Sequence, residues 1–221
     1  APITIRTQVY AGLATGATHS QSLEAWFMHI PGMKVIVPST PRDGKGLLTT
    51  AIFDEDPCLF IETIRLQGKK GPVPVDPGFS IPFGQADIKR HGTDVTLISY
   101  GRSVHEALAA AATLQEQGVS AEVIDLRTLV PLDVDTIVES TRRTRRAVIV
   151  HDAVQFAGPG AEIAAILHSE LFGELAAPVE RVAARFVPNP AAAALEAQVY
   201  PSPARIVEAA QRTLKNANAH G

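Results

Sequence analysis

The sequence has little sulfur and few aromatic side chains: one cysteine, one tryptophan and two methionines occur in 221 residues. A single cysteine cannot form an internal disulfide, which excludes a disulfide-stapled secreted scaffold and indicates a reducing compartment. Cys58 lies in the apolar run Pro57-Cys-Leu-Phe-Ile, which predicts a buried thiol in a strand rather than a nucleophile. No apolar run approaches the ~20 residues that span a bilayer, and no signal peptide is visible, so no membrane partner is expected.

A strong charge of one sign is also absent. The formal net charge is −3, which gives no reason to expect nucleic acid or an anionic surface as a partner. The densest basic run, residues 142–146, fits a solvated helix end or a subunit contact better than a phosphate-binding track. The Gly-x-Ser-x-Gly motif, the P-loop and the dinucleotide fingerprint are missing too. What is present is 46% hydrophobic residues, enough for an ordinary core.

The first 65 residues alternate between strand and helix patterns. Strands are predicted over residues 3–7, 34–37 and 58–63 because β-branched and other apolar residues cluster there. A helix is predicted over residues 22–29 with Ser22 as its N-cap, and a second helix follows Thr40, with Pro41 at the first helical position. This alternation predicts a parallel sheet.

The rest of the chain divides into a linker and a second α/β unit. Residues 65–82 are rich in proline, glycine and lysine and predict a linker, so we place domains at residues 1–64 and 83–221. The second domain has four strand patterns alternating with helix patterns, which predicts a doubly wound sheet. The strands are expected at residues 95–100, 121–126, 147–150 and 179–183, and the helices at residues 103–117, 131–140, 158–172 and 203–214. Ser103 and Glu106 have the spacing of a capping box, and Gly118 is expected to end that helix.

A small-residue loop before the first helix is the best candidate for chemistry. Gly12 and Gly16 let the backbone adopt conformations that other residues avoid. The loop then places His19 beside Gln21, and an imidazole can exchange a proton near neutral pH. From the residues alone, a solvated or structurally hydrogen-bonded histidine is the commoner explanation.

Several longer motifs occur in a fixed order along the chain. They are His19-Ser-Gln-Ser, Pro31-Gly-Met-Lys-Val-Ile-Val-Pro, Ile81-Pro-Phe-Gly-Gln-Ala-Asp-Ile, Asp94-Val-Thr-Leu-Ile-Ser-Tyr-Gly and Glu122-Val-Ile-Asp-Leu-Arg-Thr-Leu-Val-Pro-Leu-Asp. Together they resemble the beta subunit of the thiamine-diphosphate-dependent 2-oxoacid dehydrogenase component, in the transketolase-like superfamily. The resemblance implies an α/β fold, with a partial thiamine-pyrimidine-type domain followed by a transketolase C-terminal-like domain. It also implies that the beginning of the first domain precedes Ala1.

The same resemblance implies a shared active site. The cofactor is thiamine diphosphate with Mg²⁺, and its main ligands lie on an alpha subunit or before Ala1, so no cofactor-binding residue is expected in this chain. His19 matches the family's catalytic histidine, which handles protons during acyl transfer to a lipoyl arm, and Gln21 is expected to be a local hydrogen-bond partner. The implied partners are the alpha subunit in an α2β2 assembly, a second beta subunit and a lipoyl acyltransferase core. Alone, the chain is expected to be inactive.

The resemblance also implies a metal site. Some relatives bind structural potassium through backbone carbonyls, and by position the ligands would be Ile3, Thr4, Ala51, Asp54 and Asp56. Oxygen ligands suit a hard cation. A helix C-terminus with solvated acids remains an equal alternative.

The expected function is therefore oxidative decarboxylation of a 2-oxoacid, with branched-chain substrates favoured and pyruvate next. Acetoin dehydrogenase and a transketolase-like enzyme are alternatives of the same fold. A non-catalytic assembly or docking module is the alternative from another class. The expected location is the bacterial cytoplasm, or the mitochondrial matrix in a eukaryote.

Overall fold

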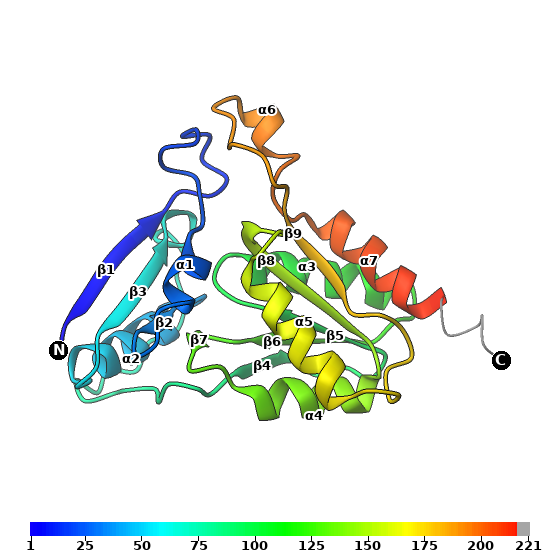
Figure 1. The fold of residues 1–221 in the computed structure, drawn as a ribbon, viewed down its shortest axis with the longest axis horizontal. Coiled ribbons are helices and arrows are strands. Elements are labelled where there is room, and N and C mark those ends of the chain that lie inside the picture. The colour runs from blue at the N-terminus through cyan, green and yellow to red at the C-terminus, as the bar shows by residue number, and fades with distance from the viewer. Residues whose placement is uncertain (216–221) are drawn as a thin grey trace.

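The computed structural model describes residues 1–215 and has an α/β fold with two sheets (Figure 1). The last six residues of the predicted second domain lie outside the described part. The first sheet contains, in spatial order, β1 (Thr4–Val9), β3 (Cys58–Thr63), β2 (Lys34–Ile36) and β7 (Thr128–Val130). Strands β1, β3 and β2 are parallel, as the sequence pattern predicts, whereas β7 is antiparallel to β2.

Strand β7 was not expected from the sequence. It is only three residues long, and it comes from the second half of the chain. Val130 pairs with Val35 and Thr128 pairs with Ile36, with an irregularity between the two pairs. The first sheet is therefore completed by a strand from the part of the chain that the sequence assigns to the second domain.

The second sheet has the order β4 (Asp87–Arg90), β6 (Ala121–Asp125), β5 (Val95–Ser99), β8 (Ala147–Val154) and β9 (Glu180–Ala184). All pairs are parallel except β4 with β6, so a doubly wound, mostly parallel sheet is confirmed with one added antiparallel edge strand. Helices α3 (Ser103–Glu116) and α7 (Pro203–Lys215) pack on one face, and α4 (Val134–Thr144) and α5 (Pro159–Glu170) pack on the other.

The two sheets share a hydrophobic core. Because side chains alternate along a strand, Leu59 and Ile61 point toward the face where they join Ile98 and Ile149 of the second sheet. Cys58 and Phe60 point the other way, toward α2 (Pro41–Ile52). Burial raises the pKa of the Cys58 thiol to about 11, which fits the prediction of a core thiol.

The expected linker is packed against the protein along part of its length. After a short 3₁₀ turn, η1 (Ile64–Leu66), the segment has no regular element until β4. Ile81 is nevertheless buried beside Phe60 and Leu47. A Cβ atom added at Gly46 of α2 would lie 2.5 Å from Ile81 Cγ1, so this glycine permits the segment to dock.

The helix-start predictions have mixed outcomes. Thr40 is confirmed as a cap, because its side chain accepts a hydrogen bond from Asp43 N. The Ser22 cap is wrong, since α1 (Glu24–Met28) has Leu23 as its N-cap with no side-chain bond. The capping box at Ser103 is also wrong: its hydroxyl donates to Asp152 instead.

The helix ends also differ in part from the sequence pattern. Gly118 adopts a φ of +79° immediately after the last turn of α3, as expected for a glycine that ends a helix. The helix expected over residues 131–140 instead begins at Val134, because Asp133 accepts a hydrogen bond from Thr136 N and caps it.

Candidate functional site

The loop over residues 10–22 joins β1 to α1 and carries His19. Gly12, Ala14 and Gly16 all have positive φ angles, of +81°, +54° and +74°. These turns bring the chain back on itself, so Tyr10 and His19 lie with ring centroids 5.8 Å apart. The His19 side chain is exposed, which leaves its imidazole accessible to a reacting group.

Side chains inside the loop hold its shape. Thr15 Oγ1 lies 2.7 Å from the hydroxyl of buried Ser20. Gln21 Nε2 donates to the Ala17 carbonyl at 3.0 Å, so Gln21 is the local hydrogen-bond partner that the sequence predicts. Both bonds close the turn around His19 without using the imidazole.

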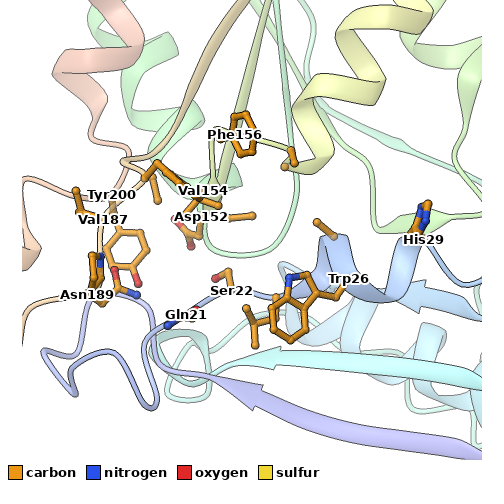
Figure 2. A pocket seen from close by; sticks show the side chains of 18 residues that line it. Gln21, Ser22, Trp26, His29, Asp152, Val154, Phe156, Val187, Asn189 and Tyr200 are labelled. Atoms are coloured by element: carbon orange, nitrogen blue, oxygen red, sulfur yellow. The ribbon is translucent and has the colours of Figure 1, made fainter.

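A cavity of about 940 Å³ opens beside this loop, between α1 and the loops that follow β8 and β9 (Figure 2). Gln21, Ser22 and Trp26 form one wall, and Phe156 and Tyr200 belong to the wall opposite. Most of the lining is apolar, and Trp26, Phe156 and Phe186 are each 70% exposed. His19 is outside the wall of this cavity, although Gln21, two residues later, is part of it.

Two buried acids, Glu24 and Asp152, lie at the cavity, and Asp152 is part of its lining. Tyr100 donates a hydrogen bond of 2.7 Å to Glu24, and burial raises the pKa of the Glu24 carboxyl to about 7. Asp152 accepts two hydrogen bonds from Arg102, from Nε at 3.0 Å and from Nη2 at 2.5 Å. Glu24 therefore joins α1 to Tyr100, directly after β5, and Asp152 of β8 is joined to Arg102 in the turn that follows β5.

His151 is a structural histidine. Its Nδ1 lies 3.0 Å from the Ala153 carbonyl and its Nε2 accepts from Gly160 N, which places the proton on Nδ1. Burial lowers the pKa of His151 to about 4, so the ring is neutral. A Cβ atom at Gly160 would lie 2.6 Å from Nε2. Gly158 and Gly160, at the start of α5, therefore allow this helix to pack closely against His151.

The five residues suggested for potassium lie around the start of β1 and the end of α2. Thr4 Oγ1 donates to the Ala51 carbonyl at 2.7 Å, and the Ile3 carbonyl accepts from Cys58 N at 2.9 Å. Asp54 and Asp56 instead face Lys34, whose Nζ lies 2.6 Å and 3.2 Å from their carboxylates. Hydrogen bonding to Asp54 raises the pKa of Lys34, and its single ammonium pairs with both carboxylates.

A second charged cluster, missed by the sequence pattern, joins α2 to the second sheet. Asp43, fully buried, lies 2.9 Å from Lys89 Nζ and 2.9 Å from Arg127 Nη2. Both cations also contact Asp87. Within residues 1–215, no group of three or more His, Cys, Asp or Glu side chains is placed to hold a metal ion. In the same range, no helix is long and apolar enough to cross a membrane.

Known proteins resemble the chain along nearly its whole length. The beta subunit of acetoin:2,6-dichlorophenolindophenol oxidoreductase from Cupriavidus necator is 47% identical over 214 residues, which are 97% of this chain and 63% of that protein. The pyruvate dehydrogenase E1 component subunit beta of Rickettsia felis is 44% identical over 213 residues, or 96% and 64% of the two chains. The mitochondrial pyruvate dehydrogenase E1 component subunit beta-2 of Oryza sativa is 44% identical over 214 residues, which are 96% of this chain and 57% of that protein. The chain thus spans less than two thirds of the length of these relatives.

A solved structure described as a split gene transketolase, an inactive beta4 tetramer, superposes with a TM-score of 0.76 over 96% of this chain and 66% of that one. At 24% identity this likeness shows the fold. Residues 1–68 match the transketolase pyrimidine binding domain, and residues 84–206 match the transketolase C-terminal domain. Since the second match alone covers more than half of the sequence, the chain belongs to the transketolase-like family.

Proposed function

We propose that this chain works as the beta subunit of a thiamine-diphosphate-dependent dehydrogenase component that acts on a 2-oxoacid or on acetoin. The observation that carries the proposal is the exposed His19 on a loop with three positive-φ turns, in a chain 44–47% identical to acetoin and pyruvate dehydrogenase beta subunits. The proposal divides the chain at residues 65–82, with a pyrimidine-binding-type part before this segment and a C-terminal domain after it.

In this proposal, His19 is the catalytic residue of the chain. When bound, thiamine diphosphate supplies the electron sink for breaking a carbon–carbon bond. His19 then exchanges a proton with the reacting group and orients it as the acyl unit passes to a lipoyl arm. The loop turns and the Gln21–Ala17 bond hold the backbone around His19.

Cofactor binding is assigned mainly to the partner. From the likeness to beta subunits of thiamine-dependent enzymes, we place the Mg²⁺ and diphosphate ligands on an alpha subunit, in an α2β2 assembly with a second beta subunit and a lipoyl acyltransferase core. The chain alone is then inactive. The bacterial cytoplasm is the proposed location, or the mitochondrial matrix if the protein is eukaryotic.

The experiment that tests this function uses the chain assembled with its alpha subunit. His19→Ala is expected to lower acyl transfer to lipoamide by at least ~100-fold, the size of a lost general acid–base. His168→Ala, an exposed histidine on α5, is the matched control. Unchanged turnover in His19→Ala would show that the loop is not catalytic.

The same assembly decides the substrate. The sequence motifs favour branched-chain 2-oxoacids, whereas the relatives described above are named for acetoin and pyruvate. Rates with a branched-chain 2-oxoacid, pyruvate and acetoin, compared at equal concentrations, identify the substrate. A two-carbon transfer between sugar phosphates would instead support a transketolase-like enzyme.

A non-catalytic docking module is the second candidate. Three aromatic side chains that are 70% exposed around one cavity favour a surface that another protein covers. If the chain binds its alpha subunit but His19→Ala changes no rate, this second function is the better description.

The potassium site is proposed as a separate structural feature. Because Lys34 already pairs with the carboxylates of Asp54 and Asp56, the ion would be held mainly by backbone carbonyl oxygens, those of Ile3, Thr4, Ala51, Asp54 and Asp56. Thermal unfolding in potassium and in choline chloride at equal ionic strength tests it. Equal melting temperatures would rule the site out.

A further inference from the structure

The loop that carries His19 is held from the far end of the chain. Helix α6 (Ala193–Glu196) follows β9 and lies beside the loop (Figure 1). Its Glu196 carboxylate accepts a hydrogen bond from Gly12 N at 3.3 Å through Oε1, and one from Ala14 N at 2.5 Å through Oε2. Glu196 is only 2% exposed, so this contact replaces most of the hydration of its carboxylate.

The geometry of the turn explains why an acid is needed. Gly12 and Ala14 both have positive φ angles, a conformation that costs a non-glycine residue free energy. In this turn the two N–H groups point at one carboxylate, and a charged acceptor makes each hydrogen bond stronger. A glutamine has the same shape but only one acceptor oxygen, and its amide N–H groups would face the backbone N–H donors.

Two further side chains fix the loop on either side of His19. Arg65 Nη1 donates to the Gly12 carbonyl at 2.6 Å. The Tyr200 hydroxyl donates to the Ser20 carbonyl, and burial raises the pKa of Tyr200, so it remains a donor. The loop is therefore fixed at residue 12 and at residue 20, with His19 between the two points.

We propose that Glu196 is a positioning residue that holds the loop in the form in which His19 reaches the reacting group. This inference rests on the proposed function of His19. It gives the segment after β9 a role in the reaction through the backbone N–H groups of the loop that Glu196 holds.

The test replaces Glu196 in the chain assembled with its alpha subunit. Glu196→Gln is expected to speed hydrogen exchange of the Gly12 and Ala14 amides by at least about tenfold, the size of losing one charge-assisted hydrogen bond. The kcat for lipoamide acylation is also expected to fall about tenfold, whereas the KM for the substrate should change less than about twofold. Glu196→Asp keeps the negative charge, so it is expected to recover part of the amide protection and part of the kcat. Glu139→Gln, on the exposed side of α4, is the control.

Hydrogen exchange separates this inference from the proposed function. If exchange rises in Glu196→Gln while His19→Ala keeps full activity, Glu196 holds the loop but the loop is not catalytic. If exchange at Gly12 and Ala14 is unchanged, the positioning role is wrong whatever the rates. Arg65→Met removes an exposed contact to the same turn and is expected to raise exchange less, so it serves as the second variant if Glu196→Gln fails to fold.

Discussion

Glu24 is one of two buried acids, with Asp125, whose raised pKa should make stability depend on pH near neutrality. The pKa of Glu24 is raised to about 7 by burial, whereas an exposed glutamate titrates near ~4.3. Between these pH values the folded state binds more protons than the unfolded state. The free energy of unfolding should therefore fall as pH rises through this window, by up to about 1.4 kcal/mol per pH unit.

The Glu24→Gln variant is expected to lose this decline, because glutamine stays neutral and still accepts the Tyr100 hydrogen bond. Urea unfolding between pH 4.5 and pH 8, followed by the fluorescence of Trp26, the single tryptophan, measures it. His151 acts in the opposite direction: its lowered pKa of about 4 removes stability as pH falls below ~6.5. Comparing the two proteins at each pH cancels this contribution and that of Asp125, whose pKa burial raises to about 6. Parallel pH curves would contradict the prediction.

At the scale of elements, helix α2 offers a matched pair of glycines. A Cβ atom at Gly44 would have no neighbour within 4 Å, whereas at Gly46 it would lie 2.5 Å from Ile81 and 2.8 Å from Phe79. Gly44→Ala is expected to stabilise the protein by up to ~1 kcal/mol through helix propensity. Gly46→Ala is expected to destabilise it by about 1–3 kcal/mol through overpacking. Denaturant midpoints measure both, and equal effects would mean that the segment of residues 65–82 is not docked on α2.

The sequence predicts elements best where the signal is local. Thr40 before Pro41 marks a helix start, and the apolar run of residues 58–61 marks β3, because caps and buried strands depend on neighbouring residues. It fails at β7, whose three residues become a strand only by pairing with β2. It also misplaces the start of α1, a helix too short for periodicity to define.

The candidate site likewise contains residues that the local sequence reveals and residues that only the fold brings together. The glycines and His19 of the loop stand together in the sequence and are visible there. Glu196, which binds the same loop, is 184 residues from Gly12, and no local pattern connects the two. The buried pair Glu24 and Tyr100 is likewise made by the fold, from positions 76 residues apart.

At the scale of the whole molecule, the two sheets should unfold together. Apolar residues of both sheets form one core, with Leu59 and Ile98 among its members. Asp43 of the first unit is buried against Lys89 and Arg127 of the second. A shared core and a buried ionic contact make separate unfolding costly, so tryptophan fluorescence and circular dichroism should give one coincident transition.

Asp43→Ala tests the ionic part of this junction. The change leaves two buried or half-buried cations, Lys89 and Arg127, with one partner fewer, and removing one member of a buried ion pair typically costs about 3–5 kcal/mol. Asp135→Ala, an exposed acid in the first turn of α4, is the control and should cost less than ~1 kcal/mol. The variant should melt at a lower temperature but still in one transition, since the apolar core remains. Two separated transitions, one for Trp26 and one for the second sheet, would show that the charged cluster rather than the core couples the sheets.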